Sequence, residues 1–174
     1  MPKLSCTNDN NSIETEVFFE LNLKEKFTVN PFLSEDFKRA ESELKEDQVW
    51  QRYEIKLKAA QNEIVFNSND KAANEVKGLF CFNLNPHNEI QQLITDLESF
   101  LENSEKEFIF EPLEPSIELK ITKSHAALLK VELWVDAGNT TSIIYTWDAL
   151  GIRLMTEREK LVKFISDLKE TSLD

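Results

Sequence analysis

The chain has 174 residues, of which 41% are hydrophobic, and a formal net charge of −12 at pH 7. A chain of this length can bury about 70% of its unfolded surface in one domain, and its composition is far from that of disordered proteins. Its acidity disfavours nucleic acid and anionic membranes as partners, and no segment approaches the roughly 20 apolar residues of a membrane span. The excess of carboxylates either keeps the protein in solution or attracts a basic protein partner.

The two cysteines, Cys6 and Cys81, are too few for a disulfide framework and predict a reduced, cytoplasmic protein. Residues 1–11 are polar and lack the apolar core of a signal peptide, so we expect them to form a disordered tail. Residues 12–174 then form a single domain.

Alternation of apolar and polar residues predicts strands over 13–23, 49–60, 63–66 and 79–84. Asn30-Pro31 should end the first of them, and Phe18 interrupts its polar face. Between the first two strands, residues 34–47 carry six carboxylates. This segment is either a short helix capped by Ser34 or an acidic loop.

Asn85 followed by Pro86 predicts the start of the first helix, because asparagine is a good N-cap and proline suits the first helical position. The helix should present one apolar stripe to a sheet. The stripe consists of Ile90, Leu93, Ile94, Leu97, Phe100 and Leu101.

Further strands are predicted over 108–110, 117–121, 129–135, 142–147 and 151–155, as an antiparallel meander. Thr156 and Glu159 have the spacing of a capping box, which predicts that a second helix begins there. The apolar stripe of this helix consists of Leu161, Phe164, Ile165 and Leu168.

These elements predict an α+β fold in which two amphipathic helices pack on one or two antiparallel sheets. Each sub-unit, about residues 12–104 and 105–174, is a run of strands followed by a helix. Asn85 and Thr156 occupy equivalent positions at the helix starts, and Asp96 and Asp167 match within the helices. The order indicates either a duplicated unit or merely two helices with a similar stripe.

Catalytic patterns are lacking in the sequence. His87 and His125 have no ligand partners at metal-binding spacing, and the three glycines form no phosphate-binding loop. Glu111 and Glu114 flank a proline-rich turn and are either an acid–base pair or solvated turn residues. We therefore expect no catalytic residues, no cofactor and no metal, and a carboxylate-dependent hydrolase is the enzyme alternative.

Three segments resemble the WapI-type immunity proteins that accompany large secreted bacterial toxins. They are residues 110–121 (FEPLEPSIELKI), 135–138 (VDAG) and 145–153 (YTWDALGIR), followed by the helix with Leu161, Phe164 and Leu168. The resemblance covers about residues 108–168 and its motifs are structural. It implies a cytoplasmic, non-enzymatic protein that occludes a toxin domain. If the toxin is a nuclease, its basic cleft would suit an acidic inhibitor.

Candidate contact residues follow from charge and from aromatic character. Trp134 and Tyr145 serve as anchors if they face solvent, and otherwise belong to the core. Asp148 either bonds backbone amides in its turn or contacts the partner, and Arg153 should pair with Asp148 or Asp136. The acidic candidates are Glu35, Asp36, Glu41, Glu43, Glu46 and Asp47. A homo-oligomer formed through an apolar edge strand is the other binding alternative.

Overall fold

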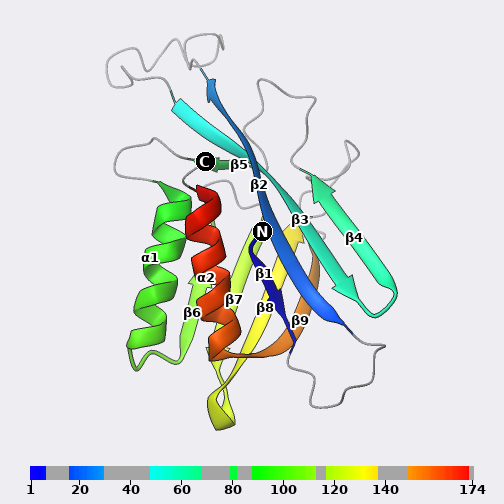
Figure 1. Cartoon of the computed structure of the whole chain (residues 1–174), viewed down its shortest axis with the longest axis vertical. Coiled ribbons are helices and arrows are strands. Elements are labelled where there is room, and N and C mark those ends of the chain that lie inside the picture. The colour runs from blue at the N-terminus through cyan, green and yellow to red at the C-terminus, as the bar shows by residue number, and fades with distance from the viewer. Residues whose placement is uncertain are drawn as a thin grey trace.

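The structure is a computed structural model that describes residues 1–6, 16–29, 48–67, 79–81, 88–112, 117–136 and 149–172. It has the predicted α+β fold, with two antiparallel sheets and two helices that contact sheet strands. In Figure 1 both helices lie in front of the second sheet, and the first sheet crosses beside them. The helices and the first sheet therefore cover the same face of the second sheet.

The first sheet is an antiparallel meander of four strands with one added strand. The order is β1 (Lys3–Ser5), β2 (Val17–Val29), β3 (Gln48–Ala59) and β4 (Asn62–Asn67). Strand β5 (Leu79–Cys81) pairs with the first part of β3, and β4 pairs with the second part. Strands are therefore confirmed at all four predicted places, although residues 13–15 and 82–84 lie outside the described chain. Strand β2 continues past residue 23 and ends at Val29, directly before Asn30 as expected. The acidic segment 34–47 lies outside the described residues.

The first residues of the chain are ordered in a strand, so the prediction of a disordered tail over residues 1–11 is wrong for this part. Strand β1 pairs with β2, and Leu4 is completely buried in the core. The physical reason is tertiary: a three-residue strand is too short to show a period, but it gains ladder hydrogen bonds and the burial of a leucine. Residues 7–11 lie outside the described chain.

The two long strands bury alternate residues as predicted, with Phe19 and Leu21 of β2 beside Ile55 and Leu57 of β3. Phe18, which breaks the alternation, is also buried, on the other face. Lys3 Nζ lies 3.7 Å and Lys58 Nζ 5.7 Å from its ring centroid. The two lysine side chains therefore cover the aromatic ring and make cation–π contacts with it.

The second sheet is a four-stranded antiparallel meander, also as predicted. Its strands are β6 (Glu107–Phe110), β7 (Ile117–Lys123), β8 (Leu128–Asp136) and β9 (Ala149–Glu157), in that order. The short 3₁₀ helix η3 (His125–Ala127) connects β7 to β8. The strand predicted over 142–147 falls outside the described residues.

Helix α1 (Glu89–Glu102) buries the whole predicted stripe, but it begins later than predicted. Its N-cap is Asn88 and not Asn85: the Asn88 side chain accepts a hydrogen bond from the Gln91 backbone N–H at 2.9 Å. Both asparagines are good caps by type, so local sequence does not distinguish them.

Helix α2 (Arg158–Ser172) also buries its predicted stripe, but Thr156 is not its cap. Thr156 belongs to β9, opposite Leu129, and its hydroxyl donates to the Ser5 carbonyl at 2.8 Å. The capping-box prediction is therefore wrong, because pairing with β8 and with the buried N-terminal strand outweighs the local capping pattern. The two helix starts also differ in kind, so the proposed equivalence of Asn85 and Thr156 fails, although strands precede a helix in each half.

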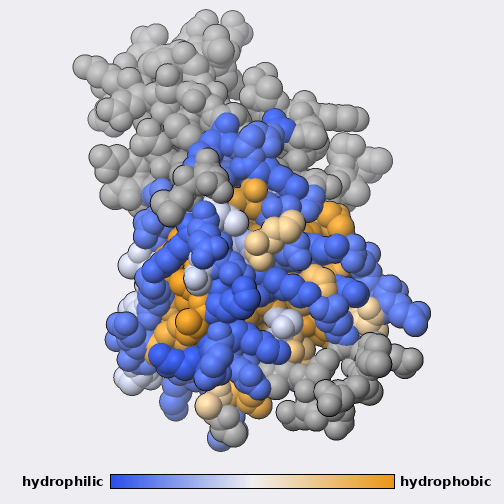
Figure 2. Space-filling model, in the orientation of Figure 1, coloured by the Kyte–Doolittle hydropathy of each residue, from blue (hydrophilic) through white to orange (hydrophobic). Residues whose placement is uncertain are grey.

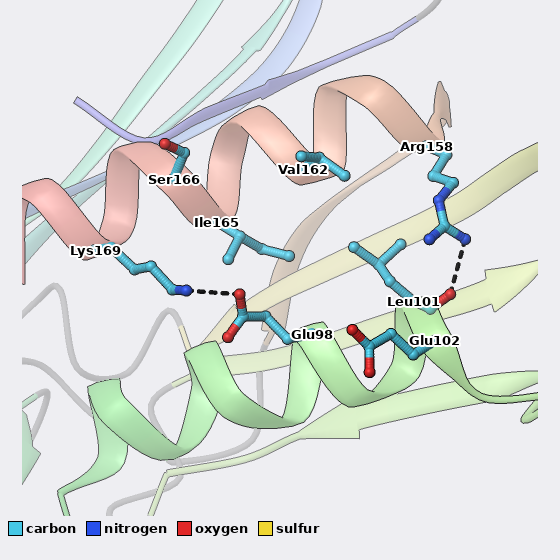
Figure 3. A pocket seen from close by; sticks show the side chains of 8 residues that line it. All are labelled: Glu98, Leu101, Glu102, Arg158, Val162, Ile165, Ser166 and Lys169. Atoms are coloured by element: carbon cyan, nitrogen blue, oxygen red, sulfur yellow. Dashed lines mark hydrogen bonds and ion pairs between the residues drawn. The ribbon is translucent and has the colours of Figure 1, made fainter.

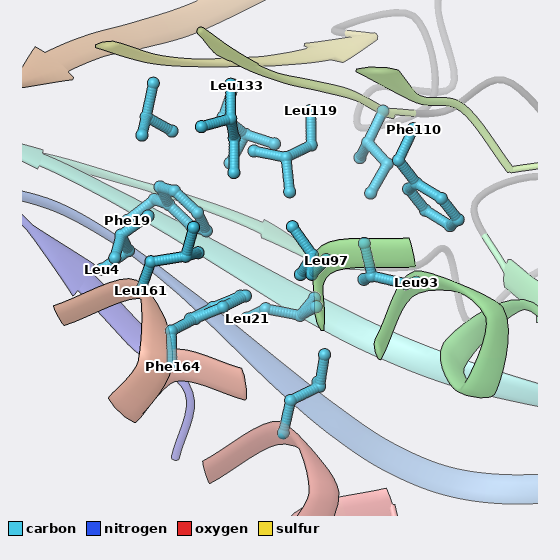
Figure 4. Close-up of a cluster of buried hydrophobic side chains, with 14 of the residues drawn as sticks. Leu4, Phe19, Leu21, Leu93, Leu97, Phe110, Leu119, Leu133, Leu161 and Phe164 are labelled. Carbon is cyan, nitrogen blue, oxygen red and sulfur yellow. The ribbon is translucent and has the colours of Figure 1, made fainter. Parts of the chain in front are cut away.

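One core cluster joins both sheets and both helices. Phe19 of β2 and Phe164 of α2 meet edge to face, with ring centroids 5.5 Å apart. Figure 4 shows side chains from β2, α1, α2 and the second sheet converging there. The inward residues of the second sheet are thus fully used in the core, and its outward face remains for other contacts.

Candidate protein-binding surface

The outward face of the second sheet carries Trp134, the sequence-predicted anchor that the structure describes. Strand alternation turns Trp134 away from Leu133 and Val135, which are buried in the core. Its side chain is 36% exposed. The alternative that Trp134 belongs to the core is therefore wrong. In the register of the sheet, Glu118 of β7 and Gly151 of β9 lie on either side of it.

Gly151 provides the space in which the Trp134 ring lies. A Cβ atom at position 151 would stand 2.7 Å from Trp134 Cδ2 and 2.6 Å from the Leu133 carbonyl oxygen. Real Cβ atoms do not approach other atoms so closely, so only glycine fits without rearrangement. An aromatic ring that covers a glycine in the neighbouring strand is a known stabilising arrangement in sheets. The indole is therefore held against the sheet while part of it faces solvent.

Beside Trp134, Glu132 is at the centre of an ion-pair network. Its carboxylate accepts from Arg153 Nε at 2.6 Å and lies 2.8 Å from Lys130 Nζ. The hydrogen bonds from Lys130 and Arg153 hold the pKa of Glu132 below its usual value, against the effect of burial. Arg153 thus pairs with Glu132, which lies directly opposite it in the sheet. The two predicted partners, Asp148 and the side chain of Asp136, lie outside the described part of the chain. The pairing depends on the register of β8 and β9, and no sequence spacing predicted it.

On the other side of Trp134, two carboxyl groups meet. Burial and a hydrogen bond with Glu111 raise the pKa of Glu118. Lys120, whose charge acts against this shift, is bound to Glu107 at 2.6 Å. The sequence analysis paired Glu111 with Glu114 as a possible acid–base pair, and Glu114 lies outside the described residues. The contact of Glu118 with Glu111 was not predicted, because only the folded sheet brings β7 beside Glu111, the residue that follows β6.

The remaining candidates cannot be placed on this face. Two aromatic and turn candidates, Tyr145 and Asp148, lie outside the described residues. So do all the acidic candidates: Glu35, Asp36, Glu41, Glu43, Glu46 and Asp47. The acidic segment 34–47 belongs to the connection between β2 and β3, whose ends Val29 and Gln48 are paired.

Within the described parts of the chain, no group of three or more histidine, cysteine, aspartate or glutamate side chains could hold a metal ion. None of the helices described here is long and apolar enough to cross a membrane. Comparison of the chain with protein-family models, with curated proteins and with solved structures finds no match.

Proposed function

We propose that this protein is a non-enzymatic binding protein, and that the outward face of its second sheet contacts a protein partner. The observation that carries the proposal is Trp134, which is partly exposed and held in place by Gly151. Tryptophan is enriched among residues that dominate binding energies, and a ring fixed before binding loses little conformational entropy on association.

The charges beside Trp134 favour a basic partner surface. Glu111 and Glu118 lie together, and the pKa of Glu118 is raised in the protein alone. A lysine or arginine from a partner would stabilise both carboxylates in their charged form. The net charge of −12 would favour encounter with a basic protein in the same way.

The class of partner rests on the resemblance to WapI-type immunity proteins. We propose a toxin domain that this protein binds and neutralises in the cytoplasm. A nuclease domain would fit the charge argument, because its substrate-binding cleft is basic. The acidic segment 34–47, Tyr145 and Asp148 remain candidate partner contacts because of their charge and aromatic character.

The test uses the reading frame immediately upstream of this one. Its last ~130 residues, a typical domain length, are expressed and titrated with this protein by calorimetry at two salt concentrations. We expect tight binding that weakens with salt, and rescue of cells that express the toxin domain. Absence of binding, or an upstream frame that encodes no secreted toxin, would contradict the toxin proposal.

The role of Trp134 is tested separately in that complex. We expect W134A to weaken binding by at least 2 kcal/mol, a typical value for such an anchor. W134F keeps an aromatic ring over Gly151 and should retain part of the affinity. V65A removes exposed apolar area from the first sheet and is the matched control. If W134A binds as tightly as the wild type, the outward face of the second sheet is not the contact surface.

A homo-oligomer is the second candidate, and strand β4 favours it. Strand β4 ends the strand order of the first sheet, and Ile64 and Val65 are each 44% exposed on its two faces. An edge strand of this kind can pair with another strand. Sedimentation analysis over a range of concentrations tests this: a mass above 20.2 kDa that falls with dilution, and that I64K abolishes, would support it.

A further inference from the structure

A cleft of about 300 Å³ lies between helices α1 and α2. Its floor is apolar, from Leu101, Ile165 and the 48% exposed Val162. Figure 2 shows hydrophobic surface between the two helices on a face that is otherwise mostly hydrophilic. The volume is at the lower limit for a ligand site, which suits a single side chain better than a large molecule.

Four charged residues line the cleft, and three of them are engaged. Lys169 of α2 pairs with Glu98 of α1 at 2.6 Å. Arg158 donates to the Leu101 carbonyl at 2.7 Å, at the C-terminal end of α1, where the helix dipole offsets its charge. The carboxylate of Glu102 has no ion pair or hydrogen bond within the described chain. Figure 3 shows it at the cleft between these two interactions.

Two features of α1 itself disfavour a negative charge at Glu102. It stands four residues after Glu98, and like charges at this spacing repel each other on a helix. It lies in the last turn of α1, where a negative charge opposes the helix dipole and where the helix has no basic residue of its own. The surrounding segment is acidic as well, since residues 88–112 contain seven carboxylates and one lysine.

We propose that this cleft binds the basic side chain, arginine or lysine, of a protein partner. The aliphatic stem would lie on Leu101, Val162 and Ile165, and the charged end would pair with Glu102. Long basic side chains bury their stems on apolar surface in this way and keep the charged end on a polar group. The proposal does not depend on the Trp134 face, because the cleft is formed by other elements.

The test uses the full chain and the tripeptide acetyl-Gly-Arg-Gly-amide as probe. Nuclear magnetic resonance titration should show shifts confined to residues around 98–102 and 158–169. The matched probe contains citrulline, which has the same shape without the charge, and should bind more weakly. Free spermidine is titrated in the same way and should not reproduce the shifts of the arginine tripeptide, because a polyamine is attracted by acidic surface in general. Equal binding of arginine and citrulline, or shifts spread over the whole surface, would overturn the proposal.

Substitution of Glu102 gives a second readout. E102Q should weaken arginine-tripeptide binding about two- to fivefold, the range for one exposed charge pair. It should also raise the urea midpoint of unfolding, because it removes an unfavourable charge. E170Q, on α2 outside the cleft, should leave binding unchanged. If Glu102 only supported the fold, E102Q would not combine weaker binding with higher stability. Unchanged binding in E102Q would refute the proposed pairing of Glu102 with a basic side chain.

Discussion

Trp134 lies where it does because the residue opposite it has no side chain. We predict that G151A destabilises the protein by about 1–3 kcal/mol, the usual range for overpacking. The added Cβ would displace the indole and press on the Leu133 carbonyl, 2.6 Å away. Urea unfolding measures the stability, and tryptophan fluorescence should shift to longer wavelength as the ring becomes more exposed.

The control for this prediction is the double variant in which G151A is combined with W134F. The contact with the Leu133 carbonyl remains there, so part of the stability loss should persist. The fluorescence shift should vanish, because Trp134, whose displacement causes it, is absent from this background. An unchanged spectrum in G151A alone would show that Gly151 does not position Trp134.

Glu118 and Glu132, on the same face, should respond to pH in opposite directions. The pKa of Glu118 is raised above its ordinary value of 4.5. Its protonation therefore stabilises the fold below about pH 4.5, and this contribution is lost as pH rises through the folded-state pKa. E118Q stays uncharged, so it should be more stable than the wild type at pH 7, and the difference should shrink in acid.

The pKa of Glu132 is lowered below 4.5, so its contribution is present at neutral pH and is lost as pH falls through the folded-state pKa. E132Q should therefore be less stable at pH 7, by about 1 kcal/mol because its partners are partly exposed. Thermal unfolding from pH 3 to pH 8 measures both variants. The same sign of effect for both at pH 7 would contradict the two environments described here.

At the scale of elements, the hairpin between β3 and β4 contains a strained residue. Ala60 has a φ of 56°, and it is the first of the two residues between the paired Ala59 and Asn62. Glycine is favoured at such a position, because side chains disfavour the left-handed region. We predict that A60G stabilises the protein by about 0.5–1 kcal/mol.

Ala59 provides the matched control for the hairpin. It is the last residue of β3, and A59G should destabilise by about 0.5–1 kcal/mol, because glycine weakens a strand. Chemical denaturation of both variants measures the two effects. Stabilisation by both glycines, or by neither, would show that the turn geometry at Ala60 is not under strain.

Periodicity in the sequence predicted the elements well and their ends less well. The stripe of α1 from Ile90 to Leu101 was evident, because burial on a sheet imposes a helical period. Its start was not, since Asn85 and Asn88 are equally suitable caps. Thr156 carried a strong local signal, but the tertiary bond to Ser5 decided its conformation. Of the candidate site, Trp134 was named from its aromatic character, either as an anchor or as a core residue, and its exposure in the folded sheet decides between the two. The contacts of Glu118 and Glu132 depend on register.

At the scale of the whole molecule, the N-terminal strand joins the two halves. Thr156 donates to the Ser5 carbonyl, and Lys160 Nζ donates to the Cys6 carbonyl at 2.7 Å. Leu4, the residue before Ser5, is completely buried and is the apolar part of this junction. We predict that L4A costs about 2–5 kcal/mol, the range for a leucine removed from a core.

The exposed Ile109 is the control for this prediction, because I109A removes a similar side chain that is 52% exposed. It should change the free energy of unfolding by at most about 0.5 kcal/mol. Denaturation midpoints measure both variants. If L4A proved as mild as I109A, β1 would contribute little to the stability of the fold.

The junction also determines when the protein can finish folding. Ser5 and Thr156 are 151 residues apart in the chain. A ribosome that adds about 5–20 residues per second reaches Thr156 roughly 8–30 s after Ser5. During that interval the first strand lacks β9 and α2, which it contacts in the folded protein, and Leu4 has no complete core to enter. The bonds that join the first strand to Thr156 and Lys160 therefore form only after the start of the C-terminal helix has been synthesised.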